Sequence, residues 1–138
     1  MNPVLDDLLC KKFPHLYQDR HGDIKETCMV FGFECDDGWY QLIRDLSERL
    51  EVEILCLPKE EQSLYRAVQV KEKFGELRFY MISATDQMRK LIEEAEAKSI
   101  TICESCGSLG VLRVSHGWYF TACEKHSNGA PSIGEKII

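Results

Sequence analysis

The strongest secondary-structure signal in the chain lies in AVQVKEKFGELRFYMI (residues 67–82). Apolar and polar side chains alternate on both sides of Gly75, a pattern typical of strands that bury one face. A two-residue loop with glycine first suits a tight hairpin, so we expect the turn at Gly75-Glu76 and Lys73 opposite Arg78. The stretch therefore predicts an antiparallel β-hairpin.

The predicted hairpin has one apolar face and one polar face. Phe74 belongs to the apolar face, which we expect to pack against the core. Three cations and an aromatic ring gather on the polar face, where they could bind an anionic ligand or a single nucleic-acid strand through charge and stacking. The alternative interpretation is an ordinary solvated sheet face. The residues of the candidate polar site are Lys71, Lys73, Arg78 and Tyr80.

Amphipathic helices are predicted on both sides of the hairpin. Apolar side chains recur every three or four residues from Trp39 to Ile54, and Pro58 ends this helix. Ser83, with Asp86 three residues later, resembles a capping box at the start of a helix that ends near Ser99. A shorter helix is predicted between Asn2-Pro3 and Pro14, and an apolar segment over residues 28–34 reads as a strand. The expected fold class is α+β, an antiparallel sheet with helices on one face.

The C-terminal third contains CESCGSLGVLRVSHGWYFTACEKH (residues 103–126). Cys103 and Cys106 form one closely spaced pair, and Cys123 and His126 form a second pair after sixteen residues. Each pair supplies two ligands from one tight turn, and two such turns complete the tetrahedral shell of one structural Zn²⁺. The intervening residues predict a small hairpin, which makes the segment a zinc ribbon or knuckle packed beside the α+β domain. Three buried free thiols are the alternative, and His116 competes with His126 as fourth ligand.

These signals divide the chain into three parts. Residues 1–99 are expected to form the α+β domain, and residues 100–128 the zinc-binding module. Residues 129–138, GAPSIGEKII, are rich in turn-forming residues and are expected to be a flexible tail.

The remaining cysteines offer weaker candidates. Cys28 and Cys35, with His15 and His21 upstream, could form a second metal site, although their spacing does not suit a knuckle. Cys35 also precedes a helix N-terminus, a position that can activate a thiol, but the neighbouring acidic residues oppose a thiolate. Buried thiols are the simpler interpretation.

Composition limits the class of partner. The 138 residues carry a formal net charge of -6, whereas a protein that binds duplex DNA needs a broad basic surface, so duplex DNA is not an expected partner. No apolar run is long enough to cross a membrane, and the N-terminus does not resemble a signal peptide. Seven cysteines without a secretion signal indicate a reducing compartment, so we expect a cytoplasmic protein.

Three stretches together resemble a family of small bacteriophage and prophage proteins. They are FGFECDDGWYQLI (31–43), VQVKEKFGELRFY (68–80) and the CxxC…CxxH segment (103–126), and the resemblance covers roughly residues 12–127. The family's metal-binding pattern falls on Cys103, Cys106, Cys123 and His126, and the family has no established catalytic residues to transfer. The resemblance implies a phage-encoded accessory protein in the cytoplasm of a bacterial host.

The motifs predict a non-enzymatic zinc-binding protein. The resemblance implies that it acts by stoichiometric binding of a host protein, with an antiviral-defence component as the target class. Two alternatives stay open. One is sequestration of a small anionic nucleotide near the polar hairpin face, and the other is a nucleic-acid-binding regulator that uses the zinc module. The sequence does not predict an oligomeric state.

Overall fold

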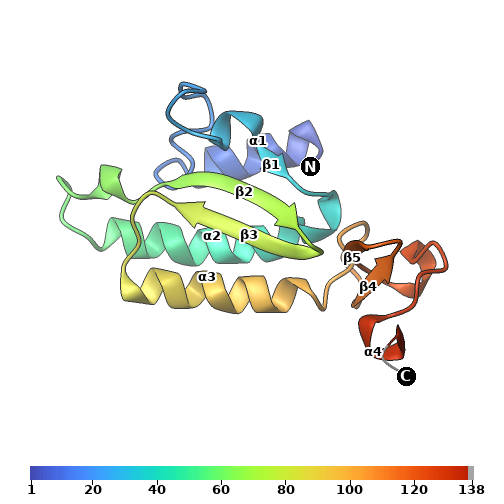
Figure 1. The fold of residues 1–138 in the computed structure, drawn as a ribbon. Helices are drawn as coiled ribbons and strands as arrows, with labels where there is room; N and C mark the ends of the chain where they lie inside the picture. Colours follow the sequence, from blue (N-terminus) through green and yellow to red (C-terminus); the bar gives the residue numbers. More distant parts are fainter. Residues whose placement is uncertain (137–138) are drawn as a thin grey trace.

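The computed structural model describes residues 1–136 as an α+β layer (residues 1–99) followed by a C-terminal module (residues 100–136), shown in Figure 1. The layer holds a three-stranded sheet, and the module holds a two-stranded sheet. The elements in chain order are α1 (Pro3–Lys12), β1 (Phe33–Glu34), α2 (Tyr40–Leu55), β2 (Ala67–Lys73), β3 (Glu76–Met81), α3 (Asp86–Ser99), β4 (Val111–Ser115), β5 (Trp118–Ala122) and α4 (Ile133–Lys136).

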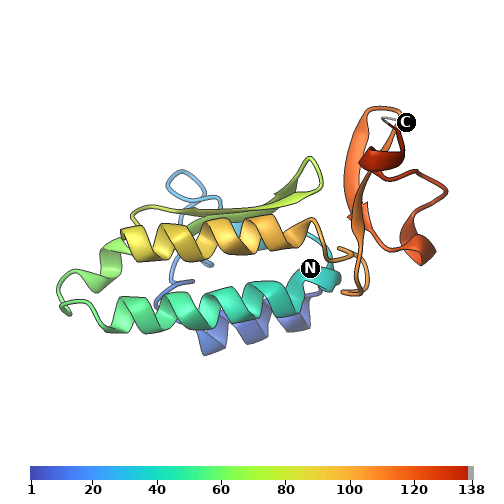
Figure 2. The same ribbon diagram turned by 90° about the horizontal axis from the view of Figure 1, so that it is seen from below.

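The sheet of the layer is mixed, which corrects the expectation of an antiparallel sheet. Its strand order is β1-β2-β3, and β1 runs parallel to β2 with Glu34 beside Lys71. The chain crosses from β1 to β2 through α2, and a helical crossover of this kind returns the second strand in the direction of the first. Helices α2 and α3 lie side by side on one face of the sheet, as predicted (Figures 1 and 2).

The β2–β3 hairpin exists, but its turn and register differ from the prediction. Phe74 and Gly75 form the turn, with φ angles of 55° and 83°, and Lys71 rather than Lys73 lies opposite Arg78. Two successive positive φ values give the backbone twist that suits a two-residue hairpin loop. Because the register moves by two residues, every strand side chain keeps its predicted face. Phe74 is the exception, since its place in the turn leaves it 67% exposed.

Capping residues set the helix boundaries. Asn2 accepts a hydrogen bond from the Val4 amide at the start of α1, as its position before Pro3 predicts. At the start of α3 the cap is Thr85, whose hydroxyl accepts from the Met88 amide at 3.2 Å. The predicted cap at Ser83 is therefore wrong by two residues.

The core lies between the sheet and the two long helices. The ring of Tyr17 packs edge-on against Phe33 and Phe79, and its hydroxyl hydrogen bonds to Ser47. Segment 14–27 contains no long helix or strand, yet it contributes Leu16 and Tyr17 to this core. The largest fully buried side chains of the layer are Trp39, Leu9, Leu16, Met29, Ile43, Leu50, Ile54, Leu77, Met88 and Val70.

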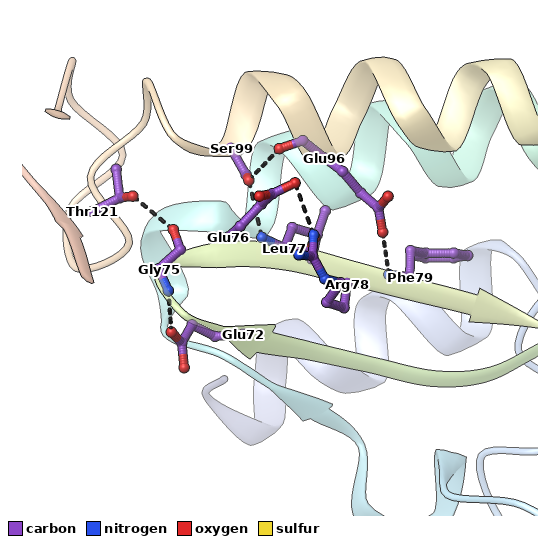
Figure 3. Close-up of polar contacts among 9 residues, drawn as sticks. All are labelled: Glu72, Gly75, Glu76, Leu77, Arg78, Phe79, Glu96, Ser99 and Thr121. Carbon is purple, nitrogen blue, oxygen red and sulfur yellow. Dashed lines mark hydrogen bonds and ion pairs between the residues drawn. The ribbon is translucent and has the colours of Figure 1, made fainter. Parts of the chain in front are cut away.

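Strand β3 lies at the edge of the sheet, and side chains of α3 cover its free amides (Figure 3). The Leu77 amide donates to Ser99 Oγ at 2.9 Å, and the Phe79 amide donates to Glu96 Oε2 at 3.0 Å. Covered edge amides cannot pair with a strand of another chain. These two amides are therefore unavailable to a strand added at this edge.

Part of the segment predicted as a flexible tail lies alongside β4 and contacts it. Ser132 pairs with Arg113, the Val114 amide donates to the Pro131 carbonyl, and Ala130 is buried. Positions 137 and 138 of the predicted tail lie outside the described residues. Among the helices of residues 1–136, none combines the length and the apolar character that crossing a bilayer requires.

Candidate metal centre

Four side chains from two tight turns converge at one end of the module. Cys103 and Cys106 come from the turn that precedes β4, and Cys123 and His126 come from the 3₁₀ turn that follows β5. Their potential ligand atoms all lie within 4.8 Å of one another. The structure thus brings together the four residues that the sequence pattern identified.

The distances among these atoms fit a single tetrahedral ion. Cys106 Sγ lies 3.7 Å from Cys123 Sγ, and His126 Nδ1 lies 3.7 Å from Cys103 Sγ and 3.2 Å from Cys123 Sγ. Metal–sulfur bonds of about 2.3 Å place tetrahedral sulfur ligands about 3.8 Å apart, and a nitrogen ligand falls slightly closer. The cluster is therefore already close to the dimensions of an occupied site.

The first turn has the backbone hydrogen bonds of a metal knuckle. The Cys103 amide donates to the Ser108 carbonyl at 2.7 Å, and the Gly107 amide donates to the Cys103 carbonyl at 2.8 Å. Gly107 has a φ of 83°, where a residue with a side chain would be strained. Hydrogen bonds from the Ser108 side chain and backbone lower the pKa of the Cys106 thiol to about 6, which favours the thiolate that binds metal.

The hairpin β4–β5 separates the two histidines that compete for the fourth position. His116 and Gly117 form its turn, with φ angles of 51° and 80°, and Ser115 pairs with Trp118 beside them. The opposite end of the hairpin, where Val111 pairs with Ala122, leads into the cysteine turns. His126 thus belongs to the cluster, whereas His116 lies at the far end of the hairpin and hydrogen bonds to Ser115.

A buried arginine fastens the module together, and the sequence analysis did not identify it. Arg113 Nε donates to the Ala122 carbonyl at 3.0 Å, and its Nη1 donates to the Ala130 carbonyl at 2.8 Å. Its Nη2 also lies 3.5 Å from a carboxylate oxygen of Glu124. In the sequence, Glu124 stands between the clustered residues Cys123 and His126. Arg113 therefore positions the second turn relative to β4. Its place among the apolar residues of β4 was the available signal.

Two glycines, Gly38 and Gly75, bring the layer against the module. A Cβ atom on Gly38 would lie 2.2 Å from the Cys103 carbonyl oxygen and 2.3 Å from that of Glu104, and the Gly38 amide donates to Glu104 at 2.7 Å. A Cβ atom on Gly75 would lie 2.4 Å from Leu112, and its carbonyl accepts from Thr121 (Figure 3). The contact at Gly38 requires the absence of a side chain because backbone atoms oppose it, and the φ of 83° at Gly75 also favours glycine.

Further polar contacts fix the first turn to the layer. Trp39 Nε1 donates to the Ile102 carbonyl at 2.9 Å, and the Asp36 amide donates to Glu104 Oε2 at 2.9 Å. Burial raises the pKa of Glu104 to about 7, and the nearby carboxylates of Asp36 and Glu72 act in the same direction. Figure 2 shows the module at the end of the layer where α2 begins and α3 finishes.

The predicted polar face of the hairpin forms, but it is not purely basic. Arg78 lies 2.8 Å from Glu76 in an ion pair, and Glu34 of β1 lies beside Lys71. Lys73 and Tyr80 are exposed on the same face. Two carboxylates among three cations leave little net charge to attract an anion.

The other cysteines and histidines form no additional cluster in the described residues. His15 pairs with Glu51 at 2.8 Å, and Cys28 is exposed and separate. Burial, followed by the carboxylate of Glu104, raises the pKa of Cys35 to about 12, which opposes a role as nucleophile.

Comparison of this chain with protein-family models, with curated proteins and with solved structures finds no match.

Proposed function

We propose that the C-terminal cluster binds one structural zinc ion. The observation that supports this proposal best is the convergence of three cysteine sulfurs and one imidazole nitrogen within 4.8 Å. Thiolate and imidazole ligands in a tetrahedron suit zinc, and four protein ligands leave no open position for a substrate or an attacking water. In this proposal Cys103, Cys106, Cys123 and His126 hold the ion, and the ion ties the two turns of the module.

The role proposed for the zinc is to keep the module folded and seated on the layer. Two-stranded hairpins are marginally stable alone, and β4–β5 is the only sheet of the module in the described residues. A bound ion would fix the turn that contacts Gly38 and Trp39. The zinc would thus position the exposed side chains of β5 relative to the β2–β3 hairpin.

We further propose that the protein acts by stoichiometric binding of a host protein in a phage-infected bacterium, with a defence component as the target class. The motif resemblance supports the phage setting. Large aromatic side chains exposed at the tips of both hairpins support a protein partner, because such residues dominate the energy of protein interfaces. Phe74 is 67% exposed and Trp118 is 70% exposed.

The nucleotide-binding alternative receives less support. Its candidate site, the face with Lys71, Lys73, Arg78 and Tyr80, also carries Glu34 and Glu76. A nucleotide phosphate on this face would have to displace Glu76 from its ion pair with Arg78.

The test begins with zinc and continues with the partner. Native mass spectrometry should give the mass of the chain plus one zinc, and Cys106→Ser should lose the stoichiometric metal, whereas the exposed Cys28→Ser control should retain it. Host proteins retained by the tagged wild type from a bacterial lysate are then purified and titrated calorimetrically. A saturable complex with wild type that Cys106→Ser does not form supports the proposal. Failure of every purified candidate to form a complex contradicts the proposed partner class.

A further inference from the structure

A groove of about 490 Å³ separates the tip of the β2–β3 hairpin from the outward face of β5. Trp118 and Phe120 form its aromatic wall, and Glu72 faces them from the end of β2. Figure 3 shows the Glu72 carboxylate at the hairpin tip, next to the turn at Gly75. The groove thus exists only because the module is seated against the layer.

A second hollow of about 230 Å³ adjoins the groove at Trp118 and Glu72, which line both. Its walls include the rings of Phe74, 67% exposed, and Tyr119, 39% exposed, together with Lys71 and Lys73, which do not line the first groove. The groove and the hollow thus lie on both sides of the exposed Trp118 indole. This arrangement suits an extended peptide chain that passes over the indole. Buried tryptophan and tyrosine contacts of this kind supply most of the affinity in protein interfaces.

Acidic side chains line the groove, and they favour a positively charged ligand. Asp36 and Glu72 line it together with Glu104. Within residues 1–136, neither Asp36 nor Glu72 forms an ion pair with a lysine or arginine side chain. A cationic side chain in the groove would meet unpaired carboxylates and the indole face at once, whereas a phosphate would be repelled.

We infer that this groove binds an extended peptide segment of a partner protein that carries lysine or arginine beside an apolar residue. The cationic side chain stacks on Trp118 and approaches Glu72 and Asp36. The apolar residue enters the adjoining hollow against Phe74 and Tyr119. This inference rests on the proposed protein-binding function and names the surface and the chemistry that it uses.

The test selects peptides from a random dodecapeptide display library on the zinc-loaded protein. The enriched sequences should carry a net positive charge with arginine or lysine next to an apolar residue. Binding of the synthesised peptides is then measured by their fluorescence anisotropy and by the tryptophan emission of the protein. The chain has two tryptophans and Trp39 is fully buried, so an emission change on binding reports Trp118.

Matched variants localise the binding. Trp118→Ala and Glu72→Gln should each weaken peptide binding by about tenfold or more, the loss typical of a central interface residue. Glu72→Gln removes the charge and keeps an acceptor for the Gly75 amide, which donates to Glu72 at 2.6 Å. The controls Phe31→Ala and Glu60→Gln change an exposed aromatic ring and an exposed carboxylate outside the groove, and should leave the affinity unchanged.

Three results would overturn the inference. They are enrichment of peptides without a basic residue, affinities of Trp118→Ala and Glu72→Gln equal to that of wild type, or tighter binding of a single-stranded oligothymidylate than of the peptides. Zinc content is measured on the same samples. A chain that lacks zinc contradicts the proposed metal site. A chain with full zinc and no groove-dependent peptide binding contradicts only the present inference.

Discussion

At Gly38 and Gly75 the backbone of the layer lies very close to atoms of the module. Each places its backbone where a methyl group would collide with the module. Gly38 needs this space because the carbonyls of Cys103 and Glu104 lie directly above it, and a rigid backbone cannot move aside as a side chain can. The contact between the layer and the module therefore depends on the absence of a side chain at Gly38.

Gly38→Ala should destabilise the zinc-loaded protein by about 1–3 kcal/mol, because its methyl group would overlap two backbone oxygens. Chemical denaturation followed by circular dichroism measures the change. Gly134→Ala is the matched control, since the nearest atom to its added methyl, Ser132 Oγ, lies 4.0 Å away. Equal stability of the two variants would show that the Gly38 contact is not close in solution.

At the scale of elements, helix α3 supplies hydrogen-bond acceptors to backbone amides of the edge strand β3 that do not pair with β2. Glu96 and Ser99 accept hydrogen bonds from the amides of Phe79 and Leu77 in β3. Burial raises the pKa of Glu96, and its hydrogen bond from Phe79 opposes that effect. The hydrogen bond from the Phe79 amide therefore offsets part of the free-energy cost of partly burying the Glu96 carboxylate.

Glu96→Ala should lower the free energy of unfolding by about 1 kcal/mol and speed hydrogen exchange at the Phe79 amide, because that donor loses its partner. Glu96→Gln keeps an acceptor and should restore most of the protection. Glu93→Ala, an exposed position on the same helix, controls for helix propensity. Exchange at Phe79 that is no faster in Glu96→Ala than in Glu93→Ala would contradict this role.

At the scale of the whole molecule, the two sheets are stabilised by different means. The main hydrophobic core runs from Leu9 to Ala95 and lies within the layer. The module contributes a two-stranded hairpin, a buried arginine and the metal cluster. Folding of the module should therefore follow metal binding, whereas the layer should fold on its own core.

Removal of metal by a chelator should unfold the module and leave the layer helical. Helical circular dichroism should persist while the dispersed NMR signals of β4 and β5 collapse. Cys28 and Cys56 are the exposed thiols outside the cluster, and chelation should release Cys103, Cys106 and Cys123 as well, so rapidly reacting thiols should rise from two to five. Native dispersion of β4 and β5 in metal-free protein would refute the dependence.

Sequence periodicity predicted the two long helices, the hairpin faces and the two metal-binding turns, because each depends on local spacing. It missed the features set by contacts between distant segments. The parallel pairing of β1 depends on where α2 returns the chain, and the turn at Phe74-Gly75 depends on the module that packs on Gly75. The parallel pairing of β1 with β2 also places Glu34 on the polar face beside Lys71. A prediction of the hairpin alone does not include β1, so it misses this carboxylate.

The proposed zinc site has Cys103, Cys106 and Cys123 as three ligands and His126 as the fourth. Native mass spectrometry of wild type, His126→Asn and His116→Asn under matched chelator competition tests it most directly. We expect one zinc per chain in wild type and His116→Asn, and loss of zinc from His126→Asn at a chelator concentration that the other two withstand. A wild-type chain without zinc, or loss of zinc from His116→Asn alone, would contradict it.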